Sequence, residues 1–293
     1  MEDHFCRKKL VPWTLRYATH LGYRSPDSPL FRESVGSLDL VSHIRFAAEL
    51  GMAGVQDAWA ASRPIEEQRL LGQALEDHAL EGGCVVYTSR QKIREPLWAV
   101  NKPDNRATIA TELNSAIEAA RRLRARHIVV LSGALPGVPV ALQFAAMIEN
   151  LRFAADIAGK AGMTLCLESI SAKSVPNMLL HHIGETYAAV KAVGHPSLKL
   201  IYDTSHIQIM DGDLLANLDA VWDEVALVQI ADNPGRLEPG TGEINFATIL
   251  RAITARGYSG LIELEHGWSE PTKACEQRGI ENLQRLDAAA RMA

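Results

Sequence analysis

Three carboxylates and one amide each follow a short apolar run in the second half of the chain. They are Glu168 in MTLCLES, Asp203 in LKLIYDT, Gln229 in VALVQIAD and Glu265 in LIELEH. Short runs rich in Val, Ile and Leu are typical of buried parallel strands, where a terminal charge is poorly placed for packing. If the four ends meet at one rim, the carboxylates repel one another unless a cation lies between them. A single acid would more often pair with a neighbouring Lys or Arg, but four oxygen donors at four strand ends favour a shared divalent metal.

The four side chains offer only oxygen ligands, and this decides the class of metal. Mg²⁺ and Mn²⁺ suit such a set, and Co²⁺ is tolerated. Zinc sites normally use more His or Cys. We therefore predict one Mn²⁺ or Mg²⁺ ion held by Glu168, Asp203, Gln229 and Glu265.

Glu168 and Glu265 are the predicted acid–base pair, because their strands are expected on different sides of a barrel opening. A substrate held to the metal through adjacent carbonyl and hydroxyl oxygens would lie between them. The metal polarises the carbonyl and stabilises an enediolate. One glutamate removes the α-proton, and the other returns it to the neighbouring carbon or to the opposite face. This pattern indicates isomerisation or epimerisation of an α-hydroxy carbonyl compound.

Other side chains near strand ends are candidate substrate contacts. His206 follows Asp203 by three residues, and the turn after the strand is expected to aim it at the substrate. Arg236 lies in the Gly- and Pro-rich loop NPGRLEPGTGE and is expected to bind a substrate carboxylate. Aromatic residues in such places are as often packing groups as substrate contacts. The remaining candidates for the pocket lining are Trp59, Tyr87, Ser132 and Lys173.

Glu263 alternates with Glu265 in the run LIELEH, and alternation decides which of the two faces the site. Successive side chains of a strand point to opposite faces. Glu263 is therefore expected to face the helix layer, which leaves Glu265 as the inward ligand. A shift of register by one residue would exchange the two roles.

Strand-like and helix-like segments alternate eight times along the chain. The expected strands cover residues 11–19, 53–59, 83–89, 126–133, 163–169, 198–204, 225–232 and 261–267. The segments between them carry apolar residues spaced by three and four, and Ser37 is expected to cap the helix over 38–51. Eight such repeats predict an α/β fold, a single-domain (β/α)8 TIM barrel over residues 1–293. An open dinucleotide-binding sheet would carry GxGxxG after its first strand, and that motif is absent. The polar segment 90–106 is too long for an ordinary connection and is expected to be a lid or an added rim element.

Composition and charge limit the kinds of partner that are expected for this chain. The net charge of −5 gives no electrostatic footprint for nucleic acid, and no apolar run approaches the length of a membrane span. The N-terminal MEDHFCRKKLVPW lacks the apolar core of a secretory signal. A small-molecule substrate is expected as the partner, with homo-oligomerisation left open. The widely spaced cysteines are interpreted as reduced thiols of a cytoplasmic protein: Cys6, Cys84, Cys166 and Cys275.

The strand-end segments resemble those of the xylose-isomerase-like barrel superfamily, and of its hydroxypyruvate isomerase family most closely. The segments that carry the resemblance are MTLCLESI, LKLIYDTSHIQIMDGDL, VQIADNPGRLEPGTGEINF and GYSGLIELEH. The resemblance implies Glu168 and Glu265 as acid/base residues, and these two with Asp203 and Gln229 as metal ligands. It also implies interconversion of hydroxypyruvate and tartronate semialdehyde. Ser169 and Ser171 depart from the Pro and Asn that the family often has there, and the loops at the pocket mouth look longer.

Related barrels supply the alternatives. Ketose 3-epimerases usually carry His where this chain has Gln229, so Gln229 favours the hydroxypyruvate isomerase branch. A ketose 3-epimerase, or a lyase acting on an oxidised sugar, remains the enzymatic alternative. Apurinic-site endonucleases share the DTxH motif, but the further His ligands for three zincs are missing here. The non-enzyme alternative is a barrel that only binds a sugar or serves as a partner subunit, which has no need of two acid–base glutamates.

Overall fold

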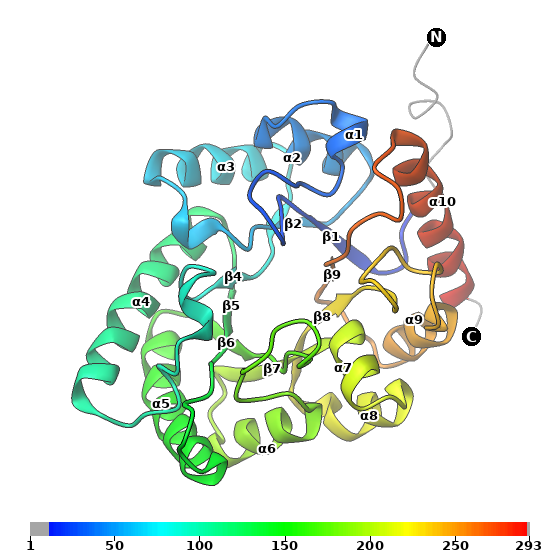
Figure 1. The fold of residues 1–293 in the computed structure, drawn as a ribbon. Helices are drawn as coiled ribbons and strands as arrows, with labels where there is room; N and C mark the ends of the chain where they lie inside the picture. Colours follow the sequence, from blue (N-terminus) through cyan, green and yellow to red (C-terminus); the bar gives the residue numbers. More distant parts are fainter. Residues whose placement is uncertain (1–11, 292–293) are drawn as a thin grey trace.

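A closed ring of parallel strands forms the centre of the molecule, and helices surround it (Figure 1). The structure is a computed structural model that describes residues 12–291, so Cys6 lies outside the described part. The strands are β1 Arg16–His20, β2 Gly54–Gln56, β3 Glu81–Gly82, β4 Val85–Val86, β5 His127–Val130, β6 Thr164–Leu167, β7 Leu198–Asp203, β8 Val225–Ile230 and β9 Leu261–Leu264. Every pairing is parallel, in the order β3-β2-β1-β9-β8-β7-β6-β5-β4.

Nine strands make an eight-stranded barrel because β3 and β4 are two halves of one barrel strand. β3 pairs only with β2 and β4 only with β5, and just Gly83 and Cys84 separate them. The barrel interior is crowded at the break, and this explains the glycine there. A Cβ atom on Gly83 would lie 2.6 Å from Glu263 Oε1 and 2.9 Å from the Gln56 Cα. The predicted (β/α)8 barrel is confirmed.

The helices form the outer layer and cap the rim (Figure 1). They are α1 Arg32–Val35, α2 Leu40–Glu49, α3 Ile65–Asp77, α4 Pro103–Arg122, α5 Val140–Lys160, α6 Ile183–Val193, α7 Thr204–Met210, α8 Leu214–Val221, α9 Phe246–Ala255 and α10 Lys273–Ala290. Short 3₁₀ turns add η2 Ala60–Ser62, η3 Lys92–Arg94 and η4 Trp222–Glu224. Among the described residues, none of these helices combines the length and apolarity that crossing a bilayer requires.

The helices pack through apolar stripes, of which α9 gives a clear case. Its buried residues are Phe246, Ile249, Leu250 and Ile253, a spacing of three and four that covers one face. The helix begins at Asn245, whose side chain accepts a hydrogen bond from the Thr248 backbone N–H. Each such buried aliphatic or aromatic side chain contributes about 1.5–3 kcal/mol relative to exposure. The helix ring therefore holds the strand ends in fixed positions around the barrel axis.

Local chemistry differs from the sequence prediction at two helix starts. The cap of α2 is Asp39, which accepts hydrogen bonds from the Ser42 backbone N–H and hydroxyl, so the prediction of Ser37 was wrong. Ser37 instead accepts from the Asp39 backbone N–H, one step outside the helix. α4 begins at Pro103, within the segment 90–106 that was expected to be a lid or rim element, because proline fits the first helical position.

The segment 90–106 packs tightly against the barrel. Trp98 is fully buried, and its ring meets the Tyr87 ring edge-on at 5.3 Å between centroids. Asn150 on α5 donates hydrogen bonds to the backbone carbonyls of Trp98 and Val100. Residues from the first part of the segment then reach over the opening of the barrel.

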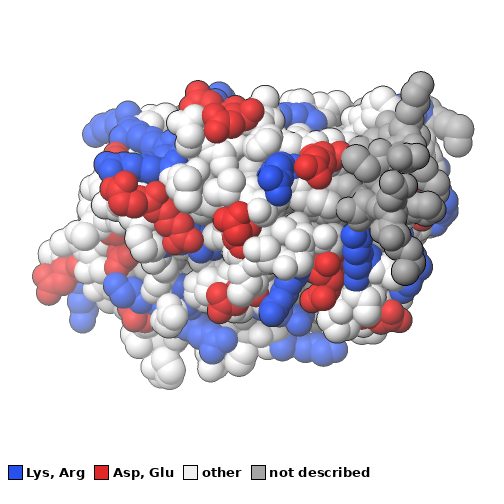
Figure 2. Space-filling model, turned by 90° about the horizontal axis from the view of Figure 1, so that it is seen from above, with Lys and Arg blue, Asp and Glu red and all other residues white. Residues whose placement is uncertain are grey.

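Acidic and basic side chains are interspersed over the face seen in Figure 2. No extended surface of one sign is visible there.

Candidate active site

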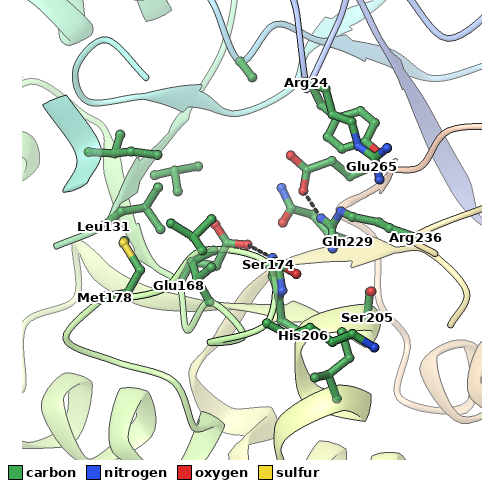
Figure 3. A pocket seen from close by; sticks show the side chains of 18 of the residues that line it. Arg24, Leu131, Glu168, Ser174, Met178, Ser205, His206, Gln229, Arg236 and Glu265 are labelled. Atoms are coloured by element: carbon green, nitrogen blue, oxygen red, sulfur yellow. Dashed lines mark hydrogen bonds and ion pairs between the residues drawn. The ribbon is translucent and has the colours of Figure 1, made fainter. Parts of the chain in front are cut away.

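A cavity of about 860 Å³ opens at the C-terminal ends of the strands (Figure 3). Its polar side is formed by Glu168, which follows β6, and Glu265, which follows β9, together with Gln229 and Arg236. Its other side is aliphatic, with Leu131 and Met178 in Figure 3. Active sites of this barrel type lie at this rim, because the loops after the strands converge there.

Strand register brings the predicted ligands together. Asp203 on β7 is paired with Gln229 on β8, and Gln229 with Glu263 on β9, so the three occupy one row across neighbouring strands. Glu168 follows the last residue of β6 and is buried. Ligand atoms of Glu168, Asp203 and His206 all lie within 4.8 Å of one another. That group includes two of the four predicted ligands, and it adds a histidine that the prediction gave only to the substrate.

His206 lies on α7, a helix that the sequence interpretation missed. The residues DTSH were expected to form a turn, but Thr204 starts a helix whose N-cap is Asp203. The Asp203 carboxylate accepts from the His206 backbone N–H at 2.9 Å. His206 Nδ1 accepts from the Ser171 backbone N–H at 3.3 Å, and Nε2 lies 3.8 Å from Glu168 Oε1 (dashed in Figure 3). Burial lowers the pKa of His206 to about 4, so the imidazole is neutral at pH 7. Because Nδ1 accepts a hydrogen bond, the single proton lies on Nε2, on the side of Glu168.

Arg236 links two of the carboxylates. Its guanidinium donates to Asp203 Oδ1 at 3.2 Å, to Asp203 Oδ2 at 2.7 Å and to Glu265 Oε2 at 2.6 Å. Its backbone adopts φ 56°, a conformation imposed by the tight loop that follows Pro234 and Gly235. Burial acts to lower the pKa of Arg236, but the two carboxylates outweigh it and raise that pKa. The predicted role of Arg236, binding a substrate carboxylate, must therefore compete with the protein's own acids.

The three acids differ in how readily they ionise. Burial raises the pKa of Glu168 well above its ordinary range, and the charges of Glu265 and Asp203 raise it further. Burial also raises the pKa of Glu265, although Arg236 partly offsets it. For Asp203 burial acts upward, but Arg236 outweighs it and lowers the pKa. The site thus contains one firmly ionised carboxylate between two glutamates that tend to hold protons.

The hydrogen bonding of Gln229 indicates whether a cation fits the site. Its Nε2 donates to Glu263 Oε2 at 2.9 Å, whereas Oε1 is buried and has no hydrogen-bond partner among the described residues. A buried acceptor without a partner is costly, by about 1–3 kcal/mol. The unpaired oxygen belongs to the residue beside Glu265 and Arg236 in Figure 3. Glu168 and Glu265 line the same cavity as Gln229. An unsatisfied amide oxygen together with carboxylates is a donor set that fits a hard divalent cation.

Glu263 was predicted to face the helix layer, and this is wrong. It is fully buried in the barrel interior, where Oε1 accepts from the Cys84 backbone N–H at 2.6 Å and Oε2 from Cys84 Sγ at 3.0 Å and from Gln229. Both Glu263 and Glu265 point inward because β9 ends at Leu264. Beyond it the Glu265 N–H bonds to both the Ile230 and Glu263 carbonyls, so the chain turns and strict alternation stops. Burial raises the pKa of Glu263 to about 7.

The remaining predicted contacts lie at different depths. Lys173 lines the cavity and is exposed. Tyr87 is buried behind the cavity wall and packs against Trp98. The Arg90 guanidinium lies over the Trp59 ring, 5.6 Å from the ring centroid. The Ser132 hydroxyl donates to the Gly133 carbonyl. Among the cavity residues that the sequence analysis did not single out are Tyr23, Arg24 and Arg90. Tyr23 and Arg24 lie in the polar loop after β1, and Arg90 was assigned only to the segment 90–106.

The fold and the acidic rim define a TIM-barrel protein with a candidate divalent-metal site at the C-terminal mouth. A family profile described as xylose isomerase-like TIM barrel matches residues 44–288. The chain belongs to this family.

The relatives of this chain include proteins named as isomerases. The chain is 29% identical to the hydroxypyruvate isomerase of Escherichia coli over 246 residues, 82% of this chain and 92% of the relative. It is 28% identical to a 2-oxo-tetronate isomerase of Pectobacterium atrosepticum over 243 residues, 79% of this chain and 91% of the relative. Among solved structures, a family 2 AP endonuclease from Brucella melitensis superposes with a TM-score of 0.75 at 25% identity, covering 89% of this chain and 96% of that one.

Proposed function

We propose that this protein is a divalent-metal-dependent isomerase of small α-hydroxy carbonyl acids, interconverting hydroxypyruvate and tartronate semialdehyde. The observation that carries the proposal is the position of Glu168, Glu265 and the unpaired Oε1 of Gln229 in one cavity. Asp203 lies just behind them, within 4.8 Å of Glu168 and bridged to Glu265 by Arg236. The names of its relatives, hydroxypyruvate isomerase and 2-oxo-tetronate isomerase, support the reaction class. A purely sugar-binding or partner-subunit barrel would not need three converging acids.

Glu168, Asp203, Gln229 and Glu265 would hold Mn²⁺ or Mg²⁺, with Co²⁺ as a tolerated substitute, and His206 lies close enough to assist. When bound, the ion would polarise the substrate carbonyl and lower the cost of the negative charge that develops on it. Asp203 supplies a permanent negative charge to the site, because Arg236 keeps its pKa low. Arg236 also fixes the directions of the Asp203 and Glu265 carboxylates.

The proton transfers fall to the two glutamates. Arg236 donates a hydrogen bond to Glu265 but none to Glu168, so Glu265 is the more readily ionised of the two. We assign to Glu265 the removal of a proton from C3 of hydroxypyruvate. Glu168, with its strongly raised pKa, delivers a proton to C2, and the aldehyde forms as the C3 hydroxyl passes its proton to the C2 oxygen, which becomes the new hydroxyl group. In the reverse direction the two residues exchange roles.

Proton exchange tests the proposal directly. Hydroxypyruvate is incubated in D₂O with the metal-free protein and with Mn²⁺ or Mg²⁺, and deuterium at C3 is followed by NMR. We expect metal-dependent exchange that Glu265→Gln abolishes. Absence of exchange with every metal would refute the isomerase assignment.

The cavity size supports a second candidate substrate. A volume of about 860 Å³ exceeds what a three-carbon acid fills, so a four-carbon 2-oxo acid fits as well. A keto sugar, acted on by a ketose 3-epimerase or a lyase using the same proton removal, is the further alternative. Product analysis on hydroxypyruvate, a 2-oxo-tetronate and free ketoses separates these outcomes.

We also propose that the protein works in the cytoplasm. The three cysteines in the described part, Cys84, Cys166 and Cys275, are free buried thiols, as expected in a reducing compartment.

A further inference from the structure

The cavity contains a second polar cluster, separate from the acids, formed by Tyr23, Arg24 and Arg90. Tyr23 and Arg24 lie in the loop between β1 and α1, and Arg90 in the loop after β4. These loops approach the opening from different parts of the barrel. We call these three residues the cationic cluster.

Arg90 is a charge that the protein leaves without a partner. Its guanidinium lies over the Trp59 ring at 5.6 Å, and no carboxylate among residues 12–291 forms an ion pair with it. Its charge acts to lower the pKa of both Glu168 and Glu265, although burial raises them more, so the guanidinium is within electrostatic reach of the two acids. The side chain is half-buried, and the aromatic ring restricts its movement. Arg90 is thus held beside the reacting groups with its donors free.

Tyr23 contributes a buried donor. Its side chain is only 7% exposed and lines the cavity, and the hydroxyl has no hydrogen-bond partner among the described residues. Burial raises the pKa of Tyr23, so the hydroxyl remains protonated. Two guanidinium groups face its ring, Arg24 at 5.2 Å and Arg236 at 5.8 Å. Arg24 also donates to the Gly235 carbonyl at 3.3 Å, which ties it to the neighbouring loop. A buried O–H surrounded by positive charge lacks only an anionic acceptor.

Arg236 was the residue expected to bind the substrate's carboxylate, but it already bridges Asp203 and Glu265. The geometry points to Tyr23 and Arg90, assisted by Arg24, as the subsite that binds the carboxylate of the substrate. This inference rests on the proposed isomerase function, since it concerns the same cavity. Arg94 and Lys173 also line the cavity, but both side chains are exposed and keep their hydration. Among the described residues, no aromatic ring lies against either of their charged groups. The cationic cluster combines unpaired charge with a buried, unsatisfied donor.

The subsite makes the protein selective for acids over neutral compounds of the same shape. Hydroxypyruvate and dihydroxyacetone share the hydroxymethyl ketone that loses its proton, and they differ in whether the third carbon is a carboxylate or a hydroxymethyl group. Charge-assisted hydrogen bonds are stronger than hydrogen bonds between neutral groups. Removing one such donor should lower binding of the acid by roughly 10- to 100-fold. The neutral ketone should be affected by less than about threefold, because it offers the subsite no charge.

The test compares Arg90→Gln and Tyr23→Phe with the matched control Arg94→Gln, from the same loop. Exchange rates in D₂O with Mn²⁺ give kcat/KM for hydroxypyruvate and for dihydroxyacetone. We expect Arg90→Gln and Tyr23→Phe to reduce the acid-to-neutral ratio of kcat/KM by at least about tenfold, mainly through KM. Arg94→Gln should leave the ratio unchanged. Equal losses on both substrates, or an unchanged ratio in Arg90→Gln, would overturn the subsite.

A binding measurement separates the subsite from the proposed reaction. D-Glycerate carries the carboxylate but no ketone, and glycerol is its neutral counterpart. Calorimetric titration of the intact protein should show glycerate binding that weakens at least about tenfold in Arg90→Gln, whereas glycerol binds weakly to both. If wild-type protein catalyses no exchange but glycerate binding still depends on Arg90, the isomerase proposal fails and the subsite stands. If glycerate binds the wild type and Arg90→Gln equally, the subsite is refuted, whether or not exchange occurs.

Discussion

Replacing Glu263 with Gln should weaken metal binding without unfolding the protein, although Glu263 is not a proposed ligand. Its two carboxylate oxygens serve different donors, the Cys84 backbone N–H at 2.6 Å and the Gln229 amide at 2.9 Å. The second bond fixes which end of the Gln229 amide faces Glu263. The unpaired Oε1 of Gln229 is thereby left for the cation.

In the Glu263→Gln variant only one of the two acceptors remains. The Cys84 backbone N–H cannot rotate away, so the new amide keeps its oxygen there and turns its NH₂ toward Gln229. Gln229 must then flip, offering Oε1 to residue 263 and presenting its own NH₂ to the metal site. At the proposed metal site, the oxygen of Gln229 is thus replaced by an NH₂ group, which cannot bind the metal. Loss of such an outer partner typically costs about 10- to 100-fold in metal affinity, or about 1.4–2.7 kcal/mol.

In contrast to its weaker metal binding, the metal-free variant is expected to be more stable than the wild type as the pH rises through 7. Burial raises the pKa of Glu263 from an ordinary 4.5 to about 7, so the folded state holds this proton more tightly than the unfolded state does. The corresponding stability is fully present below pH 4.5 and is lost as the pH rises through 7, a change of about 3 kcal/mol. Glutamine does not titrate, so the variant should gain about this much relative to wild type between pH 4.5 and pH 8.

Calorimetric titration with Mn²⁺ and urea unfolding at both pH values measure the two effects. The double variant Glu263→Gln/Gln229→Glu supplies the control, because a carboxylate at 229 can accept from the new NH₂ and still offer an oxygen to the metal. Its Mn²⁺ affinity should return to within a few-fold of wild type. Unchanged affinity in the single variant, or no recovery in the double variant, would refute the orienting role of Glu263.

Three further predictions address the acids and the fold. Glu265→Gln should lower kcat for proton exchange by about 10²- to 10⁴-fold, while D-glycerate still binds by calorimetry. Stabilisation by Mn²⁺, measured as the rise in Tm, should be larger at pH 8 than at pH 5.5, because the raised pKa values of Glu168 and Glu265 make protons compete with the metal at the lower pH. Asp39→Ala should cost about 1 kcal/mol in urea unfolding through loss of the α2 cap, whereas Ser37→Ala should cost less than half of that.

The barrel and the acidic rim could be predicted because both follow from local pattern. Apolar runs locate strands, and the parallel arrangement sends every strand end to one side, so the sequence alone suffices to place Glu168, Asp203 and Gln229 at a common rim. The contact between Glu263 and Cys84 could not be predicted, because it joins residues 179 apart through the barrel interior. Its signal was faint: Gly83 precedes Cys84 at a point where a side chain would collide with Glu263. Alternation also gave the wrong face for Glu263, since the rule holds within a strand and β9 ends at Leu264.

Charge balance supports both the proposed divalent ion and a separate cation for the carboxylate of the proposed substrate. Three buried carboxylates, Glu168, Asp203 and Glu265, face one guanidinium, Arg236. With all three ionised the formal charge is −3 + 1 = −2, which a divalent cation cancels and a monovalent one does not. The proton-holding tendency of the two glutamates is the response of the metal-free site to that deficit. Once the deficit is cancelled, an incoming carboxylate finds no spare positive charge among these groups. Arg90, on the ring of Trp59, provides that charge without forming an ion pair with the acids, although it also acts to lower the pKa of Glu168 and Glu265.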